Sequence, residues 1–352
     1  MKRFIKLIIL TSLFVPLTGC NNNNESPVNK YFTLWNDKAT LRKLINYVED
    51  VTNKNSTNYI PVKDRIATFD MDGTFVGELY PTYFEYNLLE YRALDDVNYK
   101  DIAPESVKEA AYTIRDCVRN NKKFPSGFDM VHAHAAAKAY EGMTVAEFDQ
   151  YVKDYAKKPA NGFKGMTYAE SFYKPMLEVF KYLEDNDFTY YVVSGSDRFI
   201  CRSLVESIGI EPNRVIGMDV TLKSDHQGDD EGVNYTYQQG DKIIRTDDLI
   251  IKNLKMNKVK QISQEIGKVP VLSFGNSSGD SAMHNYCLSN PTYKSEVFML
   301  IADDEEEDHV DMEETRKREA SWKEAGYTII SMKDDFKTIY GYSVEKVPFI
   351  FE

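Results

Sequence analysis

Short apolar runs alternate with segments of helical spacing along most of this 352-residue chain. The runs at 65–69, 188–193 and 269–274 each end in small or polar residues, and comparable runs follow at 297–301 and 328–331. Short apolar strands that alternate with helices are typical of a parallel sheet with helices on both faces. The pattern therefore predicts an α/β core whose polar loops gather at the carboxyl ends of the strands.

The segment between the first two predicted strands does not continue this alternation. It is rich in helix signals, with helical spacing of apolar residues at 104–118 and 144–155. We therefore expect a helical domain over 80–170, inserted into a core formed by 31–79 and 171–352.

Two helices and a hairpin complete the predicted core. Apolar residues recur at helical spacing within 35–51 and 258–266, which predicts amphipathic helices. Residues 219–248 are polar and rich in Gly and Asp. Alternation at 235–237 and an apolar pair at 243–244 predict that this stretch forms a hairpin.

The composition is that of a globular protein, with 42% hydrophobic residues and a formal net charge of −12. A negative net charge argues against nucleic acid as a partner, because its phosphate backbone requires positive charge. The four cysteines are too few for a disulfide-based scaffold, and none lies in a Cys-x-x-Cys pair. We therefore expect a protein that folds around its apolar core.

The N-terminal residues have the order of an export signal. A basic start is followed by the mostly apolar stretch 4–15, which is too short for a stable transmembrane helix. The sequence Leu17-Thr18-Gly19-Cys20 then resembles a bacterial lipobox. The resemblance implies cleavage after residue 19 and diacylation of the Cys20 thiol; the alternative is a plain secretory peptide.

The residues after Cys20 are polar and turn-forming, so we expect 20–30 to be a flexible, lipid-anchored tether. The protein would then be anchored by lipid alone to a bacterial cell membrane, inner or outer, and face the periplasm or the outside. Three cysteines remain in the mature chain, an odd number, so at least one is expected to be free or buried.

Two carboxylates follow the first predicted strand. Asp70 and Asp72 lie two residues apart in an extended segment, so their side chains share one face. Such a pair is costly unless a cation lies between them or one of them is protonated. Phosphoryl transfer uses this arrangement: one carboxylate attacks phosphorus, and the other protonates the leaving group and later deprotonates water. Gly73 lets the chain turn, and the Thr74 hydroxyl can hold the phosphate-binding loop.

The next strand ends supply complementary groups. Ser194 and Gly195 follow the second strand and can offer a hydroxyl and a backbone N–H to phosphate oxygens. Asn276 and Asp280 follow the third strand. Together with the Asp70 carboxylate and the Asp72 backbone carbonyl, their oxygens can form a magnesium site, because Mg²⁺ prefers hard oxygen ligands.

These elements resemble the haloacid dehalogenase superfamily of aspartate-nucleophile phosphatases, in particular its phosphoserine-phosphatase-like and phosphorylcholine-phosphatase-like branch. Residues 69–74 match the first motif, 192–195 match the second, and 275–280 have the spacing of the fourth. The match covers roughly residues 60–340. The resemblance implies a Rossmann-like core with an inserted helical cap of the C1 type, Asp70 as nucleophile and Asp72 as acid and base.

The third motif and one position of the fourth are less regular. The third motif requires a lysine for the phosphoryl oxygens, and Lys252, Lys255, Lys258 and Lys260 crowd together; Lys258 fits best. The fourth motif begins with an acidic residue in the family, where this chain has Asn276. A neutral amide oxygen can still bind magnesium, but the site loses a charge unless Asp280 coordinates directly.

The resulting hypothesis is a Mg²⁺-dependent phosphomonoesterase that works through an aspartyl-phosphate on a small phosphorylated substrate. Asp72 argues against a dehalogenase, because a halide leaving group needs no acid. Two alternatives stay open: a lipoprotein that binds phosphorylated ligands without catalysis, which Asn276 would favour, and a phosphotransferase.

Several aromatic residues follow the first motif: Tyr80, Tyr83, Phe84, Tyr86 and Tyr91. They are expected in the core of the cap; if some line the pocket, together with Glu78 and Glu85 they would suit a quaternary ammonium group such as that of phosphocholine. His132 and His134 diverge on a helix and are not expected to bind metal. The acidic run 303–308 is expected to be a solvated loop close to the active site.

Overall fold

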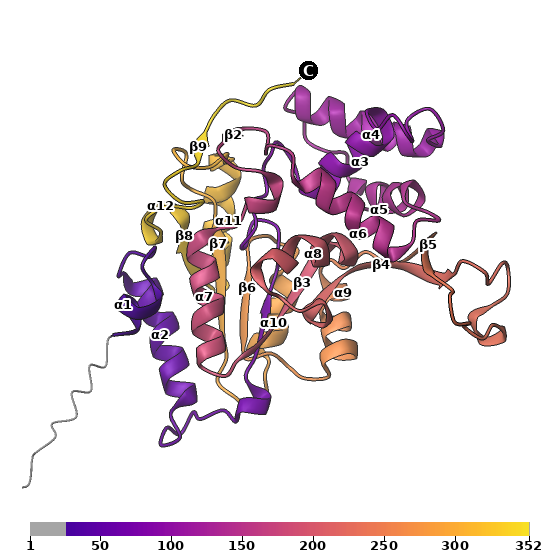
Figure 1. The fold of residues 1–352 in the computed structure, drawn as a ribbon. Coiled ribbons are helices and arrows are strands. Elements are labelled where there is room, and N and C mark those ends of the chain that lie inside the picture. Colours follow the sequence, from indigo (N-terminus) through magenta and orange to yellow (C-terminus); the bar gives the residue numbers. More distant parts are fainter. Residues whose placement is uncertain (1–25, 352) are drawn as a thin grey trace, which may run out of the picture.

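The computed structural model describes residues 26–351, and its centre is a seven-stranded sheet (Figure 1). Cys20 and the predicted signal lie outside the described residues. From one edge to the other, the strands are β5 (Ile243–Ile251), β4 (Val215–Ser224), β3 (Thr189–Asp197), β1 (Ile66–Phe69), β6 (Leu272–Gly275), β7 (Glu296–Ile301) and β8 (Thr328–Ser331). All neighbours pair in parallel except β4 and β5. The predicted α/β core with a mainly parallel sheet is confirmed.

The central strand β1 is buried on both faces, and its neighbours bring the predicted motifs together. Phe69 is in register with Val192 of β3 and with Phe274 of β6. The rings of Phe69 and Phe274 stack with their centroids 4.3 Å apart. Because parallel strands end at the same edge, the residues that follow 69 and 275 meet the last residues of β3, 194–197, there.

Helices cover both faces of the sheet. Val192 belongs to the apolar cluster that includes α2 (Ala39–Thr52) and α7 (Lys174–Asp185). The next residue, Val193, points to the other face and packs with Ile262 and Met283. The remaining core helices are α8 (Arg198–Val205), α9 (Met256–Gln261), α10 (Ser281–Leu288), α11 (Met312–Glu324) and α12 (Met332–Asp335). Successive side chains of β3 therefore point to opposite faces of the sheet, and each face is covered by its own layer of helices.

Four helices between β1 and α7 gather at one end of the core (Figure 1). They are α3 (Phe84–Leu94), α4 (Glu105–Arg119), α5 (Phe128–Ala139) and α6 (Val145–Ala156). Thr144 begins α6 with a capping box, since its hydroxyl accepts from the Glu147 N–H while the Glu147 carboxylate accepts from the Thr144 N–H. We call α3–α6 the cap. The cap meets the core through α6 against α8 and α5 against β5.

Small elements join these layers. The strands β2 (Phe163–Lys164) and β9 (Glu345–Lys346) pair in antiparallel fashion and form a second, two-stranded sheet. Short 3₁₀ turns occur at Val62–Asp64, Tyr168–Glu170, Glu206–Ile208, Pro212–Arg214 and Gly232–Asn234. In the part of the chain that the structure describes, no helix is both long enough and apolar enough to cross a membrane.

The structure corrects three predicted boundaries. Residues 27–31 form a helix, α1 (Pro27–Tyr31), so the tether predicted over 20–30 is wrong at its end; Val28 and Tyr31 pack against the core. The hairpin is formed by β4 and β5, but residues 235–237 lie in the connection between them because Tyr235 and Tyr237 bind Asp241 instead of pairing in a strand. The helix predicted at 258–266 is α9 followed by a π-helical turn, Ile262–Ile266.

The cysteine prediction is confirmed for the described residues. Cys117, Cys201 and Cys287 are all free and buried. Burial raises the pKa of the Cys201 thiol far above its usual value, so this side chain acts as a small apolar group.

Candidate active site

A cavity of about 210 Å³ lies where the carboxyl ends of the central strands face the cap. The core lines it with Asp70, Asp72, Gly195, Ser196, Lys252, Leu254, Lys258, Asn276, Ser277 and Asp280. The cap side adds Tyr83, Glu85, Tyr86 and Asp129. The core residues alone come from four separate stretches of sequence and converge on one small space, as expected at the carboxyl edge of a parallel sheet.

Lys258 lies between two carboxylates at the bottom of the cavity. Its Nζ donates to Asp70 Oδ1 at 2.5 Å and to Asp280 Oδ1 at 2.6 Å, and all three side chains are buried. Burial alone would lower the pKa of Lys258, but the charges of Asp280 and Asp70 outweigh it and raise the pKa. Lys258 is therefore a permanent cation. Of the four candidate lysines, it is the one that contacts Asp70.

The two carboxylates that share Lys258 differ in their pKa. Burial and the charge of Asp280 raise the pKa of Asp70 above its usual range. Burial also acts on Asp280, but the Lys258 charge and the backbone N–H of Ser277 hold its pKa below the usual value. The site thus holds Asp280 as a fixed anion, whereas burial and the Asp280 charge disfavour the ionised form of Asp70 despite its contact with Lys258.

Asp72 is held by a hydroxyl that the sequence did not single out. Ser196 Oγ donates to Asp72 Oδ2 at 2.7 Å. Burial raises the pKa of Asp72 to about 7, while the Ser196 hydrogen bond opposes this and Glu85 and Glu78 add to it. A carboxyl group with a pKa near neutrality can donate and accept a proton in turn, which general acid–base catalysis requires.

Ser194 does not reach the cavity, although its neighbours do. It is fully buried, and its Oγ accepts a hydrogen bond from the Ser196 N–H at 3.0 Å. Gly195 and Ser196 line the cavity instead. A side chain at position 195 would meet Leu254 Cδ2 at 2.6 Å, so a larger residue there would require the Leu254 side chain to shift. Thr74 is also fully buried, and its Oγ donates to Asn276 Oδ1 at 3.4 Å.

The residues present fit a magnesium ion. Asp70, Asp72 and Asn276 bring oxygen ligands to the cavity, and burial raises the pKa of Asp70 although Lys258 contacts it. Gly73, with φ +75°, allows Asn276 to approach this loop closely, since a Cβ there would lie 1.9 Å from Asn276 Nδ2. Asp280 is less accessible: Oδ1 binds Lys258, and Oδ2 accepts from the N–H groups of residues 276 and 277.

The sequence predicted only some of the cap residues and buried charges that lie at the cavity. Of the aromatic cluster, Tyr83 and Tyr86 line the cavity, while Tyr80 and Phe84 are buried in the core. Glu85 lies on the wall with Lys252, whose Nζ donates to Glu85 Oε1 at 2.8 Å. Glu85, Lys252 and Asp129 carry no local motif, so only the fold brings them together.

Two features noted in the sequence lie outside the cavity wall. His132 is fully buried beside Glu85, and burial lowers its pKa to about 4, so it is neutral. In the run 303–308, Asp308 is buried rather than solvated and accepts from the Tyr340 hydroxyl at 3.2 Å. The expectation of a fully solvated loop is therefore wrong at Asp308, which fills a polar position in the fold.

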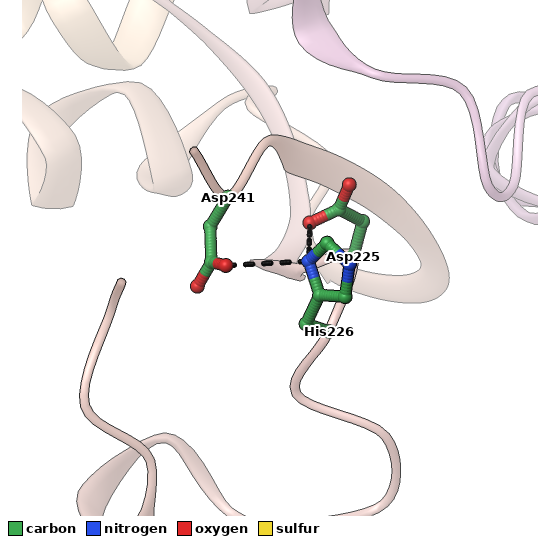
Figure 2. Close-up of side chains that lie close together, drawn as sticks. All are labelled: Asp225, His226 and Asp241. Carbon is green, nitrogen blue, oxygen red and sulfur yellow. Dashed lines mark ion pairs between the residues drawn. The ribbon is translucent and has the colours of Figure 1, made fainter. Parts of the chain in front are cut away.

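A separate polar cluster lies in the β4–β5 connection (Figure 2). His226 Nδ1 lies 2.9 Å from Asp225 Oδ1 and 3.2 Å from Asp241 Oδ1, so the three groups could hold a metal ion. Asp241 already accepts hydrogen bonds from Ser224, Tyr235 and Gln238. These bonds fold the connection onto itself, and none of the three residues lines the cavity.

Comparison with known proteins gives similarity of fold. No protein-family model and no curated protein matches the chain. A functionally unknown protein from Anaerococcus prevotii has a similar structure, with a TM-score of 0.52 and 14% identity over 89% of this chain and 99% of the other. Cytosolic 5′-nucleotidase IIIB bound to cytidine has a TM-score of 0.48 and 12% identity, covering 86% and 88%. A phosphoserine phosphohydrolase-like protein from Francisella tularensis has a TM-score of 0.37 and 12% identity, covering 67% and 87%.

Proposed function

We propose that the protein is a Mg²⁺-dependent phosphomonoesterase that works through an aspartyl-phosphate. The observation that carries this proposal is the pair of buried carboxyl groups with different partners in one cavity. Lys258 holds Asp70, and Ser196 holds Asp72. A nucleophile and a separate acid–base group with a pKa near 7 are the two parts that the reaction needs.

The residues divide the reaction between them. The Asp70 carboxylate attacks phosphorus while protonated Asp72 gives its proton to the leaving oxygen, so the ester P–O bond breaks as the aspartyl P–O bond forms. Ionised Asp72 then takes a proton from water, which attacks phosphorus and releases phosphate and free Asp70. Gly195 and Lys258 face the phosphoryl oxygens. A metal site at Asp70, Asp72 and Asn276 supplies further positive charge against these oxygens when loaded with Mg²⁺.

The cap side of the cavity supports a substrate with a cationic leaving group. Asp129 lies on this wall with the rings of Tyr83 and Tyr86, whereas Glu85 is paired with Lys252. Anionic groups beside aromatic faces favour an ammonium group. We therefore propose a small phosphomonoester of phosphocholine type as substrate.

The proposal is tested by phosphate release from p-nitrophenyl phosphate, phosphocholine, phosphoserine and sugar phosphates, with Mg²⁺ and with chelator. We expect release that requires Mg²⁺ and is fastest for phosphocholine. Equal rates for all substrates would contradict the cationic leaving group. Binding of phosphate analogues without any release would refute the phosphatase and favour a ligand-binding lipoprotein.

We also propose that the protein is exported and anchored through lipid on Cys20. The support is the order of basic start, apolar stretch and lipobox-like residues. Labelling of cells with a fatty-acid analogue should mark the protein, and Cys20→Ser should remove the label. Labelling that persists in this variant would refute the assignment.

A further inference from the structure

Asn276 stands where the resemblance implies an acidic metal ligand, and the structure shows what accompanies this change. Its Nδ2 donates to Glu78 Oε2 at 2.9 Å, and its Oδ1 accepts from Thr74 Oγ at 3.4 Å. A carboxylate can only accept hydrogen bonds. The amide nitrogen must therefore face Glu78, and the oxygen must face away from it. The orientation of Asn276 is thus fixed by its two partners.

Glu78 lies outside the first motif, in the segment that follows it. Its side chain is buried enough that desolvation raises its pKa, while Tyr83, Arg318 and Asn276 act in the opposite direction. Gly73 makes room for the contact: a Cβ at this position would lie 2.4 Å from Glu78 Oε2 and 1.9 Å from Asn276 Nδ2. A partly buried acid is therefore packed directly against the neutral residue of the metal site.

We propose that Glu78 is a positioning residue for magnesium, and that Asn276 and Glu78 together replace a single aspartate. The Asn276 amide oxygen would bind the metal ion. The Glu78 carboxylate, which contacts the Asn276 amide nitrogen, would fix the orientation of the amide and supply the missing negative charge. Groups that orient a metal ligand typically change metal affinity by about 10- to 100-fold. The inference rests on the proposed function, which provides the requirement for Mg²⁺.

The contact between Asn276 and Glu78 predicts that restoring the family's aspartate at position 276 weakens Mg²⁺ binding instead of strengthening it. An aspartate at position 276 would place a carboxylate oxygen where Nδ2 now lies, 2.9 Å from Glu78 Oε2. Two carboxylates at this distance repel each other. The substitution N276D should therefore weaken the site, although it adds the charge that the family has. Exchange of the two groups, N276D with E78Q, keeps the total charge and allows the hydrogen bond to form in the reverse direction.

The experiment is titration calorimetry of the purified protein with Mg²⁺ alone, without substrate. We expect E78Q and N276D each to bind Mg²⁺ about 10-fold or more weakly than the wild type. The double variant N276D/E78Q should bind within about 3-fold of the wild type, because the paired geometry is restored. The matched control is D129N, which removes a carboxylate from the same cavity without contact to Asn276; its Mg²⁺ affinity should stay close to that of the wild type. Thermal unfolding in chelator shows whether each variant is folded.

The outcomes separate the two proposals. Tighter Mg²⁺ binding by N276D than by the wild type would overturn the role of Glu78, and so would unchanged binding by E78Q. Weak Mg²⁺ binding by the double variant would refute the claim that exchanging the two groups restores the site. Absence of Mg²⁺ binding by the wild type would instead refute the metal requirement of the proposed function. The N276D result decides the inference even if E78Q fails to fold.

Discussion

At the scale of single residues, the cavity holds more buried acid than base. Asp70, Asp72 and Asp280 are buried there with Lys258, and Glu85 is buried with Lys252. Buried carboxylates without a cation shift their pKa upward and take up protons. Burial raises the pKa of both Asp70 and Asp72, and neighbouring carboxylates add to this effect. A phosphate group can enter such a site only with additional positive charge, which agrees with a metal-dependent reaction.

Substitution of the nucleophile tests the role of Asp70 directly. Asp70→Asn keeps the size of the side chain but removes the carboxylate that would attack phosphorus, so turnover should fall by more than about 10³-fold. The measurement is kcat with p-nitrophenyl phosphate. The control Asp116→Asn removes an exposed carboxylate from α4, and its kcat should not change. Residual activity above one tenth of the wild type in Asp70→Asn would remove Asp70 from the mechanism.

A buried acid outside the cavity gives a pH dependence of stability. Burial raises the pKa of Asp308 from 3.8 to about 7, so the folded protein binds a proton more tightly than the unfolded chain. Its contribution to the free energy of unfolding is therefore complete below pH 3.8 and is lost as the pH rises through about 7. Asp308→Asn should reduce the loss of stability between pH 5 and pH 8 by about 2 kcal/mol.

Denaturant unfolding at the two pH values measures the effect of Asp308→Asn. Glu305→Gln, which removes an exposed acid from the same loop, is the control and should retain the pH dependence of the wild type. An identical pH dependence in wild type and Asp308→Asn would show that Asp308 is ionised throughout this range.

At the scale of elements, an ion pair without solvent access connects the hairpin, the cap and the core. Arg245 of β5 donates to Asp197 Oδ2 at 2.6 Å, with exposed side-chain fractions of 0% and 2%. Asp197 also begins α8, because its Oδ1 accepts from the Phe199 N–H. The Arg245 guanidinium lies 4.0 Å from the ring centroid of Phe148 in α6. Three elements therefore depend on one buried cation.

Loss of Arg245 should be costly because it leaves Asp197 buried and unpaired. Arg245→Met should lower the free energy of unfolding by about 3–5 kcal/mol. The double variant R245M/D197N should recover part of this loss, since an asparagine removes the charge and can still accept from the Phe199 N–H. Denaturant unfolding of both variants is the measurement. A double variant no more stable than R245M would show that lost packing, rather than the unpaired charge, causes the effect.

The elements also show what the sequence can predict. Strands such as β8 are found at the predicted residues because a local apolar run marks them. The prediction that Tyr235 and Tyr237 belong to a strand was wrong, because both hydroxyls donate to Asp241. The alternation of residue types along the sequence does not reveal this contact. Lys258 was identified from a motif, whereas Ser196 and Glu78 act through contacts across 124 and 198 residues with Asp72 and Asn276. Such contacts become visible only in the fold.

At the scale of the whole molecule, the sheet and the cap contribute different parts of the cavity. The core supplies Asp70 and Asp72 from the loop after β1 and Lys258 from α9, and in the proposed reaction these residues would act on the phosphate that every substrate shares. The cap side supplies Tyr83, Tyr86 and Asp129, which face the other end of the cavity. Changes in the core should therefore affect all substrates equally, and changes in the cap should affect them according to their leaving group.

This division predicts the behaviour of a cap variant. Asp129→Asn removes a negative charge from the cap wall and should raise KM for phosphocholine by about 5- to 10-fold, because one charged contact contributes about 1 kcal/mol or more. KM for p-nitrophenyl phosphate, which has no cationic group, should change less than twofold. The ratio of the two KM values isolates the leaving-group contact from any general change in the protein. If both KM values rise together, Asp129 shapes the cavity as a whole, and the cap does not select a cationic leaving group through this residue.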